Sequence, residues 1–118
     1  MDITKLPFAP SRHARGEFVY LSGQVGLRDG ALVPGGIEAE TAQAITNVHA
    51  ELERCRPNGW TTAALVDVTV FLVDMNDYAK MNAVYAKTIG APLPTRTCIG
   101  VAALPLGARI EIKIIASY

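Results

Sequence analysis

The chain has 118 residues, of which 50% are apolar and 19% are charged, so it is long and apolar enough for a single domain over residues 1–118 with a hydrophobic core. Eleven basic residues balance eleven acidic ones, which excludes a general electrostatic attraction to nucleic acid or to an anionic membrane. No apolar run approaches the ~20 residues of a membrane span, and the N-terminal stretch lacks a secretory pattern. We therefore expect a soluble, cytoplasmic protein.

The first predicted strand spans residues 17–27, EFVYLSGQVGL, because this stretch is rich in β-branched and aromatic residues. Gly23 interrupts the strand, and a glycine in such a place often marks a bulge or a close approach of the backbone to another group. The Asp29-Gly30 pair is a hairpin turn signal, and residues 31–34 follow as a short return strand.

Two helices are predicted where apolar residues recur at intervals of three and four. The first spans residues 37–56. The second begins at Asp74 or Asn76, either of which can cap a helix, and ends at Gly90. Asn82 falls on the buried stripe of this second helix, where its amide must find hydrogen-bond partners. The other members of the stripe are Tyr78, Met81, Tyr85 and Thr88 or Ile89.

Three more strands are predicted over residues 64–75, 95–104 and 108–117. The order of hairpin, helix, strand, helix, strand, strand indicates an α+β fold in which a mixed sheet carries two helices on one face. The other face would then expose an apolar set, and we expect self-association to cover it. The side chains assigned to that uncovered face are Phe71, Cys98, Gly100, Ala102 and Ile115.

Arg96 stands near the start of an otherwise apolar strand, and alternation places it on the same face as Cys98. Arginine does not lose its charge, so burial of Arg96 requires a carboxylate, a phosphate or a row of carbonyl groups. One interpretation is that Arg96 pairs with an acid of this same protein. The other is that it grips the carboxylate of a ligand through two parallel hydrogen bonds. The residues alone leave both open.

Glu111 projects from the last strand among apolar neighbours. If the last two strands formed a simple hairpin, Glu111 would lie opposite position ~102, which is ~20 Å from Arg96. Either these strands are not direct neighbours, or the two charged groups meet only loosely within one chain. A rim ion pair of Glu111 with Arg109 or Lys113 is the alternative to a functional role.

Other kinds of site find little support in the sequence. Cys55 and Cys98 could form one disulfide, although two reduced thiols are expected in a chain without a secretory signal. Neither His13 nor His49 is placed beside Cys98 as a base, so a Cys-His nucleophile is not expected. The spacing of the cysteines and histidines fits no metal site, and no glycine-rich phosphate loop is present.

The segment PTRTCIGVAALPLGARIEIKIIA, residues 94–116, resembles the C-terminal signature of the Rid family of reactive intermediate deaminases, also called the YjgF or L-PSP family. The SGQ at residues 22–24 and the Asn-Ala-x-Tyr at residues 82–85 are similar to the family's first strand and second helix. The resemblance covers essentially the whole chain in order. It implies a chorismate-mutase-like fold and a homotrimer with ligand clefts between adjacent subunits.

The activity implied by this resemblance is that of a 2-iminobutanoate/2-iminopropanoate deaminase, which hydrolyses reactive enamines and imines to 2-keto acids and ammonia. The arginine that matches Arg96 binds the substrate carboxylate in this family, and the acid that matches Glu111 positions the attacking water. The resemblance also places Asn82, Cys98 and Gly23 around the pocket. No cofactor and no metal are implied, because the imine is already electrophilic.

The chain departs from the family pattern in three places, and two other functions stay open. Phe8 takes a position that is often tyrosine, the loop over residues 87–94 is short, and Lys113 stands where an acid is frequent. A non-catalytic trimer that binds small carboxylates or a partner protein would use the same arginine. The third possibility, an endoribonuclease or translation inhibitor, is disfavoured by the balanced charge and the lack of a histidine pair.

Overall fold

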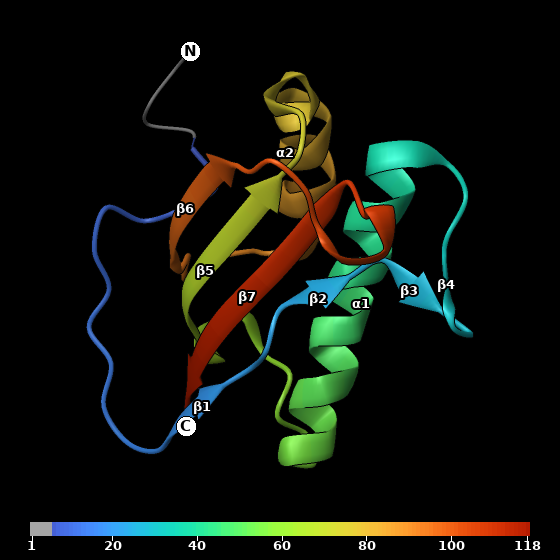
Figure 1. The fold of residues 1–118 in the computed structure, drawn as a ribbon. Coiled ribbons are helices and arrows are strands. Elements are labelled where there is room, and N and C mark those ends of the chain that lie inside the picture. Colours follow the sequence, from blue (N-terminus) through green and yellow to red (C-terminus); the bar gives the residue numbers. More distant parts are fainter. Residues whose placement is uncertain (1–5) are drawn as a thin grey trace.

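A mixed β-sheet forms the centre of the fold, with its strands in the order β1-β7-β5-β6 (Figure 1). The computed structural model describes residues 6–118, so the first five residues of the predicted domain, and of the stretch inspected for a secretory pattern, lie outside it. A further short strand, β2, also pairs with β7, and β3 and β4 form a separate hairpin. The strands are β1 Phe18–Tyr20, β2 Gln24–Val25, β3 Leu27–Arg28, β4 Ala31–Leu32, β5 Leu65–Leu72, β6 Thr95–Gly100 and β7 Ile110–Ser117.

Two helices, α1 (Gly36–Cys55) and α2 (Tyr78–Thr88), pack against one face of this sheet. The predicted capping residue Asp74 begins a short 3-10 turn, Met75–Asp77, where its side chain accepts a hydrogen bond from the backbone of Asn76. The α-helix itself therefore begins a few residues later than predicted. No helix within residues 6–118 combines the length and the apolar character needed to cross a membrane. The predicted α+β class, with a mixed sheet and two helices, is confirmed.

All five predicted strands are shorter in the structure, and two of them change most. The strand expected over residues 17–27 is divided into β1, β2 and the start of β3. Tyr20 pairs with Ile115, and Gln24 pairs with Ile112. The chain therefore advances four residues between these two pairs, whereas β7 advances three. The segment between β1 and β2, which contains Gly23, therefore has one residue more than the stretch of β7 opposite it. The strand expected over residues 95–104 ends at Gly100.

The order of the strands decides how the last two relate to each other. β6 runs parallel to β5, and β5 runs antiparallel to β7, so β5 lies between the last two strands (Figure 1). A parallel pair cannot be closed by a tight turn, and here α2 provides the crossover from β5 to β6. Of the two alternatives left open by the sequence, the correct one is that these strands are not direct neighbours.

The register of the strands shows that part of the residue set predicted for the uncovered face is wrong. Arg96 is aligned with Val68 and Cys98 with Val70, and both valines are buried beneath the helices. Aligned residues on neighbouring strands point to the same side, so Cys98 and Gly100 lie on the helix-covered face. Ala102 lies beyond the end of β6. Phe71 and Ile115 do lie on the uncovered face, as predicted. The residue pairs that contain them alternate along β5 and β7 with pairs whose side chains are buried beneath the helices.

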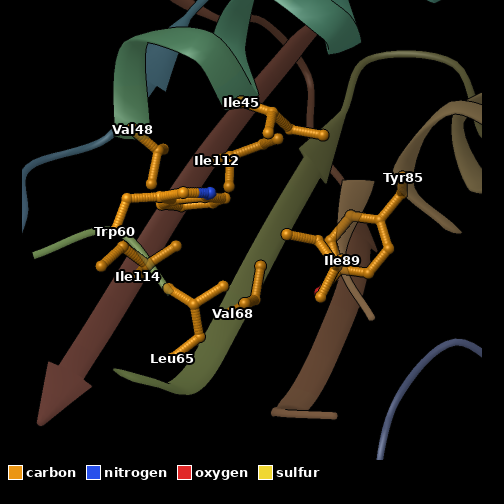
Figure 2. A pocket seen from close by; sticks show the side chains of 9 residues that line it. All are labelled: Ile45, Val48, Trp60, Leu65, Val68, Tyr85, Ile89, Ile112 and Ile114. Carbon is orange, nitrogen blue, oxygen red and sulfur yellow. The ribbon is translucent and has the colours of Figure 1, made fainter. Parts of the chain in front are cut away.

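A small apolar cavity lies in the core between the sheet and both helices (Figure 2). Its free volume is about 10 Å³, which is the space of about one water molecule. Only apolar and aromatic side chains line it, so it offers no fixed polar group to a ligand and represents imperfect packing of the core. The lining residues are Ile45, Val48, Trp60, Leu65, Val68, Tyr85, Ile89, Ile112 and Ile114.

Candidate anion site at Arg96

The side chain of Arg96 is buried, with 9% of its surface exposed, and three aromatic rings surround its guanidinium group. The guanidinium carbon lies 4.8 Å from the ring centre of Phe8, 4.9 Å from that of Tyr85 and 5.6 Å from that of Tyr78. Each such contact contributes about 0.5–2 kcal/mol, depending on how far the cation is removed from water. The N-terminal segment, β6 and α2 together therefore build an aromatic cage, Phe8, Tyr78 and Tyr85, around one positive charge.

The hydrogen bonds of Arg96 leave part of its binding capacity unused. Its Nη2 donates to the hydroxyl of Tyr78 at 3.1 Å, whereas its Nε and Nη1 are buried without a partner among residues 6–118. Within the same described residues no ion pair involves Arg96. The interpretation that Arg96 pairs with an acid of its own chain is therefore wrong for this part of the protein. Buried donors without acceptors carry a desolvation cost, which an incoming anion would remove.

The segment that carries Phe8 is fixed beside the start of β6 by two hydrogen bonds. The backbone of Ala9 donates to the carbonyl of Pro94 at 2.9 Å, and Nη2 of Arg12 donates to the carbonyl of Ala63 at 2.6 Å. Figure 1 shows the segment beyond the grey trace passing along the outer side of the sheet near β6. The ring of Phe8 thereby covers Arg96, although it contributes no hydroxyl to the site.

Two other residues of α2 have unpartnered polar atoms on the same side of the fold. Within residues 6–118, five buried side-chain polar atoms lack a hydrogen-bond partner, and four of them belong to Arg96, Asn82 and Tyr85. Such atoms are rare in folded proteins, and three of these four belong to Arg96 and to Tyr85, whose ring contacts Arg96, which indicates a site for a polar ligand. Burial raises the pKa of the Tyr85 hydroxyl to about 12, although the nearby charge of Arg96 acts in the opposite direction.

Cys98 is half-buried, two residues beyond Arg96 on β6. Burial raises the pKa of its thiol, and the positive charge of Arg96 opposes this only in part. The thiol is consequently neutral near pH 7, which agrees with its expected lack of a nucleophilic role. Cys98 and the exposed Cys55 are both free thiols, so the possible disulfide is not formed.

Glu111 lies on the uncovered face of the sheet, next to Gly23. A side chain at Gly23 would place its Cβ 1.8 Å from Oε1 of Glu111, so only glycine lets this carboxylate lie against the backbone. The close approach predicted at Gly23 is present, and the approaching group is Glu111. The expected rim ion pair is wrong for the described chain, because Arg109 binds Glu40 and the Nζ of Lys113 donates to the carbonyl of Leu21 at 3.4 Å.

One chain does not bring Arg96 and Glu111 together. Arg96 points to the helix-covered side in register with Val68, whereas Glu111 points to the open side in register with Phe71. The two residues are also separated by two strand spacings across the sheet and three residues along it, which is more than ~10 Å. Any site that uses both groups requires residues from two chains.

The sequence reasoning assigned Tyr78 and Tyr85 only to the buried stripe of the second helix. The structure adds their rings and hydroxyl groups to the site at Arg96. A signal was available, because tyrosine on a buried stripe brings a hydroxyl group that leucine or phenylalanine would not, and a buried hydroxyl requires a partner.

Comparison with known proteins agrees with the fold. Residues 5–118 match the family described as Endoribonuclease L-PSP. The 2-iminobutanoate/2-iminopropanoate deaminase of Bos taurus is 41% identical over 100 residues, covering 83% of this chain and 71% of the bovine protein. The mitochondrial protein mmf2 of Schizosaccharomyces pombe is 38% identical over 105 residues, covering 86% of this chain and 81% of its own. Because that relative's name places it in mitochondria, the cytoplasmic location expected for this chain stays a prediction.

The crystal structure of RidA from the Antarctic bacterium Psychrobacter is similar, with a TM-score of 0.79 and 32% sequence identity, covering 97% of this chain and 94% of that one. The match of the sequence over nearly its whole length, the identities with named relatives and the similarity of the fold all agree. The chain therefore belongs to the L-PSP endoribonuclease family, which is the family of the Rid and YjgF proteins.

Proposed function

We propose that this protein is a deaminase that hydrolyses 2-iminobutanoate, 2-iminopropanoate and related imines to 2-keto acids and ammonia. The observation that carries the proposal is the buried guanidinium of Arg96, which has two unpartnered donors and no ion pair among residues 6–118. A small carboxylate would supply the missing acceptors through parallel, charge-assisted hydrogen bonds. The activity named for the bovine and mouse relatives has a substrate with such a carboxylate.

The chemistry needs little beyond orientation of the reactants. Arg96 holds the carboxylate, and a water oxygen bonds to the imine carbon while the imine nitrogen takes up a proton. Glu111 accepts a proton from the water and returns it to the nitrogen. The hydroxyl group of the resulting carbinolamine gives its proton to the nitrogen, and the carbon–nitrogen bond breaks as the carbonyl forms. One imino acid and one water thus give one keto acid and one ammonia. The imine is electrophilic at the start, and the protein's main contribution is to hold water and carboxylate in place.

The complete site is proposed to form between neighbouring subunits of a homotrimer. Arg96 and Glu111 lie on opposite faces of the sheet in one chain, so Glu111 would act on substrate held by Arg96 of another chain. The uncovered face supports such an assembly because it is partly apolar. Phe71 and Ile115 are only partly exposed there, and Ile99 on the edge strand β6 is 42% exposed.

The direct test is the release of ammonia and keto acid from 2-aminoacrylate or 2-iminobutanoate generated in the assay, measured above spontaneous hydrolysis. Arg96→Ala should lower kcat/KM at least about 100-fold, because it removes charge-assisted hydrogen bonds to the substrate. Arg54→Ala is the matched control, since Arg54 is exposed on α1 and, among residues 6–118, forms an ion pair only with Glu51. Equal rates for the wild type and Arg96→Ala would rule out this role for Arg96.

A non-catalytic carboxylate-binding protein is the second candidate, because the same unpartnered donors of Arg96 support it. In that case the protein would bind 2-oxobutanoate in an Arg96-dependent manner without accelerating ammonia release. Cleavage of RNA by the purified protein, with strongly salt-dependent affinity, would instead support the nuclease function named in the family's description.

A further inference from the structure

We infer that the hydroxyl group of Tyr78 is a second binding group for the ligand carboxylate, acting together with Arg96. This inference rests on the proposed function for the identity of the ligand. It assigns a role to a hydroxyl that the sequence reasoning placed in the core. Tyr78 is the first residue of α2, and its side chain is only partly buried, whereas Tyr85 in the same cage is 1% exposed. Of the two cage hydroxyls, that of Tyr78 is therefore nearer to solvent and to an entering ligand.

The hydrogen bond between Tyr78 and Arg96 fixes which proton is available. Arginine has only donors, so Nη2 of Arg96 donates and the oxygen of Tyr78 accepts, at 3.1 Å. The phenolic proton of Tyr78 is therefore directed elsewhere, and no hydrogen bond donated by this hydroxyl is formed within residues 6–118. A phenol that accepts from a cation becomes a better donor, because hydrogen bonds in a chain polarise one another. A carboxylate beside Arg96 can receive this hydrogen bond through one bridging water.

The contact also leaves the guanidinium able to grip a carboxylate with two donors. A guanidinium has two such edges, Nε with Nη2 and Nη1 with Nη2, and both include Nη2. Tyr78 occupies one of the two hydrogens on Nη2 and so blocks one edge. The other edge keeps the second Nη2 hydrogen together with one of the unpartnered nitrogens, Nε or Nη1. A bound carboxylate would thus receive two hydrogen bonds from Arg96. The Tyr78 oxygen, on the other hydrogen of Nη2, then lies roughly 5 Å from it, so the Tyr78 hydroxyl would bind the carboxylate through one bridging water.

The test is the variant Tyr78→Phe, which removes the hydroxyl and keeps the ring of the cage. The dissociation constant of 2-oxobutanoate, measured by calorimetry on the full-length protein, should rise about 10-fold. In the deaminase assay KM should rise by a similar factor while kcat changes less than about 2-fold, because the lost contact holds the carboxylate and not the reacting carbon. Tyr20→Phe is the matched control, since Tyr20 is 67% exposed on β1, at the opposite edge of the sheet from β6.

The outcomes separate this inference from the proposed function. If the wild type binds 2-oxobutanoate but hydrolyses no imine, the deaminase proposal fails, and the dissociation constants of the wild type and Tyr78→Phe still decide the role of Tyr78. Unchanged affinity and unchanged KM in Tyr78→Phe would overturn the inference. Absence of 2-oxobutanoate binding by the wild type would overturn it as well. A lower melting temperature with unchanged affinity would show that the hydroxyl only stabilises the fold, which also contradicts the inference.

Discussion

At the scale of single residues, the protein buries a permanent cation without giving it an acid from the described part of its own chain. The rings of Phe8, Tyr78 and Tyr85 replace part of the hydration that Arg96 loses on folding. They supply only one hydrogen-bond acceptor, the hydroxyl of Tyr78, for a group with five N–H donors. A cage of this kind stabilises the charge enough for folding and keeps capacity for an anion.

Tyr85 gives a prediction about pH at this scale. Its pKa is raised from 10.0 to about 12, mainly by burial, so the folded state holds the phenolic proton more tightly than the unfolded state does. The contribution of this group to the free energy of unfolding is fully present below pH 10. It is lost as the pH rises from 10 through 12, by about 3 kcal/mol at most. The free energy of unfolding of the wild type, measured by urea denaturation, should fall more steeply above pH 10 than that of Tyr85→Phe, which has no such proton.

Near pH 7 the two proteins should differ by less than about 1 kcal/mol, because the Tyr85 hydroxyl has no hydrogen bond within residues 6–118 that the substitution would break. Other groups titrate above pH 10 in both proteins, so the difference between them isolates Tyr85. Parallel curves for the wild type and the variant from pH 7 to pH 11.5 would contradict this assignment.

At the scale of elements, a buried carboxylate fixes α1 to the start of β7. Glu40 is fully buried, and its Oε1 and Oε2 accept hydrogen bonds from the backbone and the guanidinium of Arg109 at 2.9 and 2.7 Å. Arg109 immediately precedes β7, the strand that carries Glu111 two positions later. The link therefore ties the position of Glu111 to the helix layer on the other side of the sheet. Sequence periodicity alone gave no reason to expect an acid on the buried stripe of α1.

Loss of this link should be costly. Glu40→Ala leaves the backbone N–H of Arg109 without an acceptor and creates a cavity, so we expect a loss of about 2–4 kcal/mol in the free energy of unfolding. Glu40→Gln keeps one acceptor oxygen and should lose less. Glu51→Ala, at the exposed ion pair with Arg54, serves as the control and should change stability little. Urea denaturation at pH 7 measures all three, and equal stability of Glu40→Ala and the wild type would show that the link contributes nothing.

At the scale of the whole molecule, the two charged groups of the proposed mechanism face opposite sides of one sheet. A shared site predicts complementation between two inactive variants, Arg96→Ala and Glu111→Gln. When equal amounts are unfolded, mixed and refolded, about one quarter of the sites in a random trimer should combine an intact arginine with an intact glutamate from the neighbour. Recovery of about one quarter of the wild-type deaminase activity is the expected result.

Each variant refolded alone provides the control and should remain inactive. A site contained within one chain would give no recovery in the mixture, because every chain then lacks one of the two groups. The same samples, examined by sedimentation, report whether the protein is a trimer.

The sequence by itself determined the class of the fold and the family, because hydrophobic periodicity and a nearly continuous signature over residues 94–116 are local properties. It also indicated Arg96, since a charge in an apolar strand is visible without coordinates. It could not align the faces of different strands. Alternation divides each strand into two faces, but only the register of β6 on β5 shows that Cys98 lies beneath the helices while Phe71 does not.

Tertiary structure alone decided what surrounds Arg96. The cage is built from Phe8, Tyr78, Tyr85 and the strand of Arg96, which are far apart in the chain and meet only when α2 crosses over from β5 to β6. The separation of Arg96 from Glu111 has the same origin, because the insertion of β5 between the last two strands depends on pairing across the sheet. Hydrogen bonds between distant strands are a property of the folded chain, and no local pattern of residues specifies them.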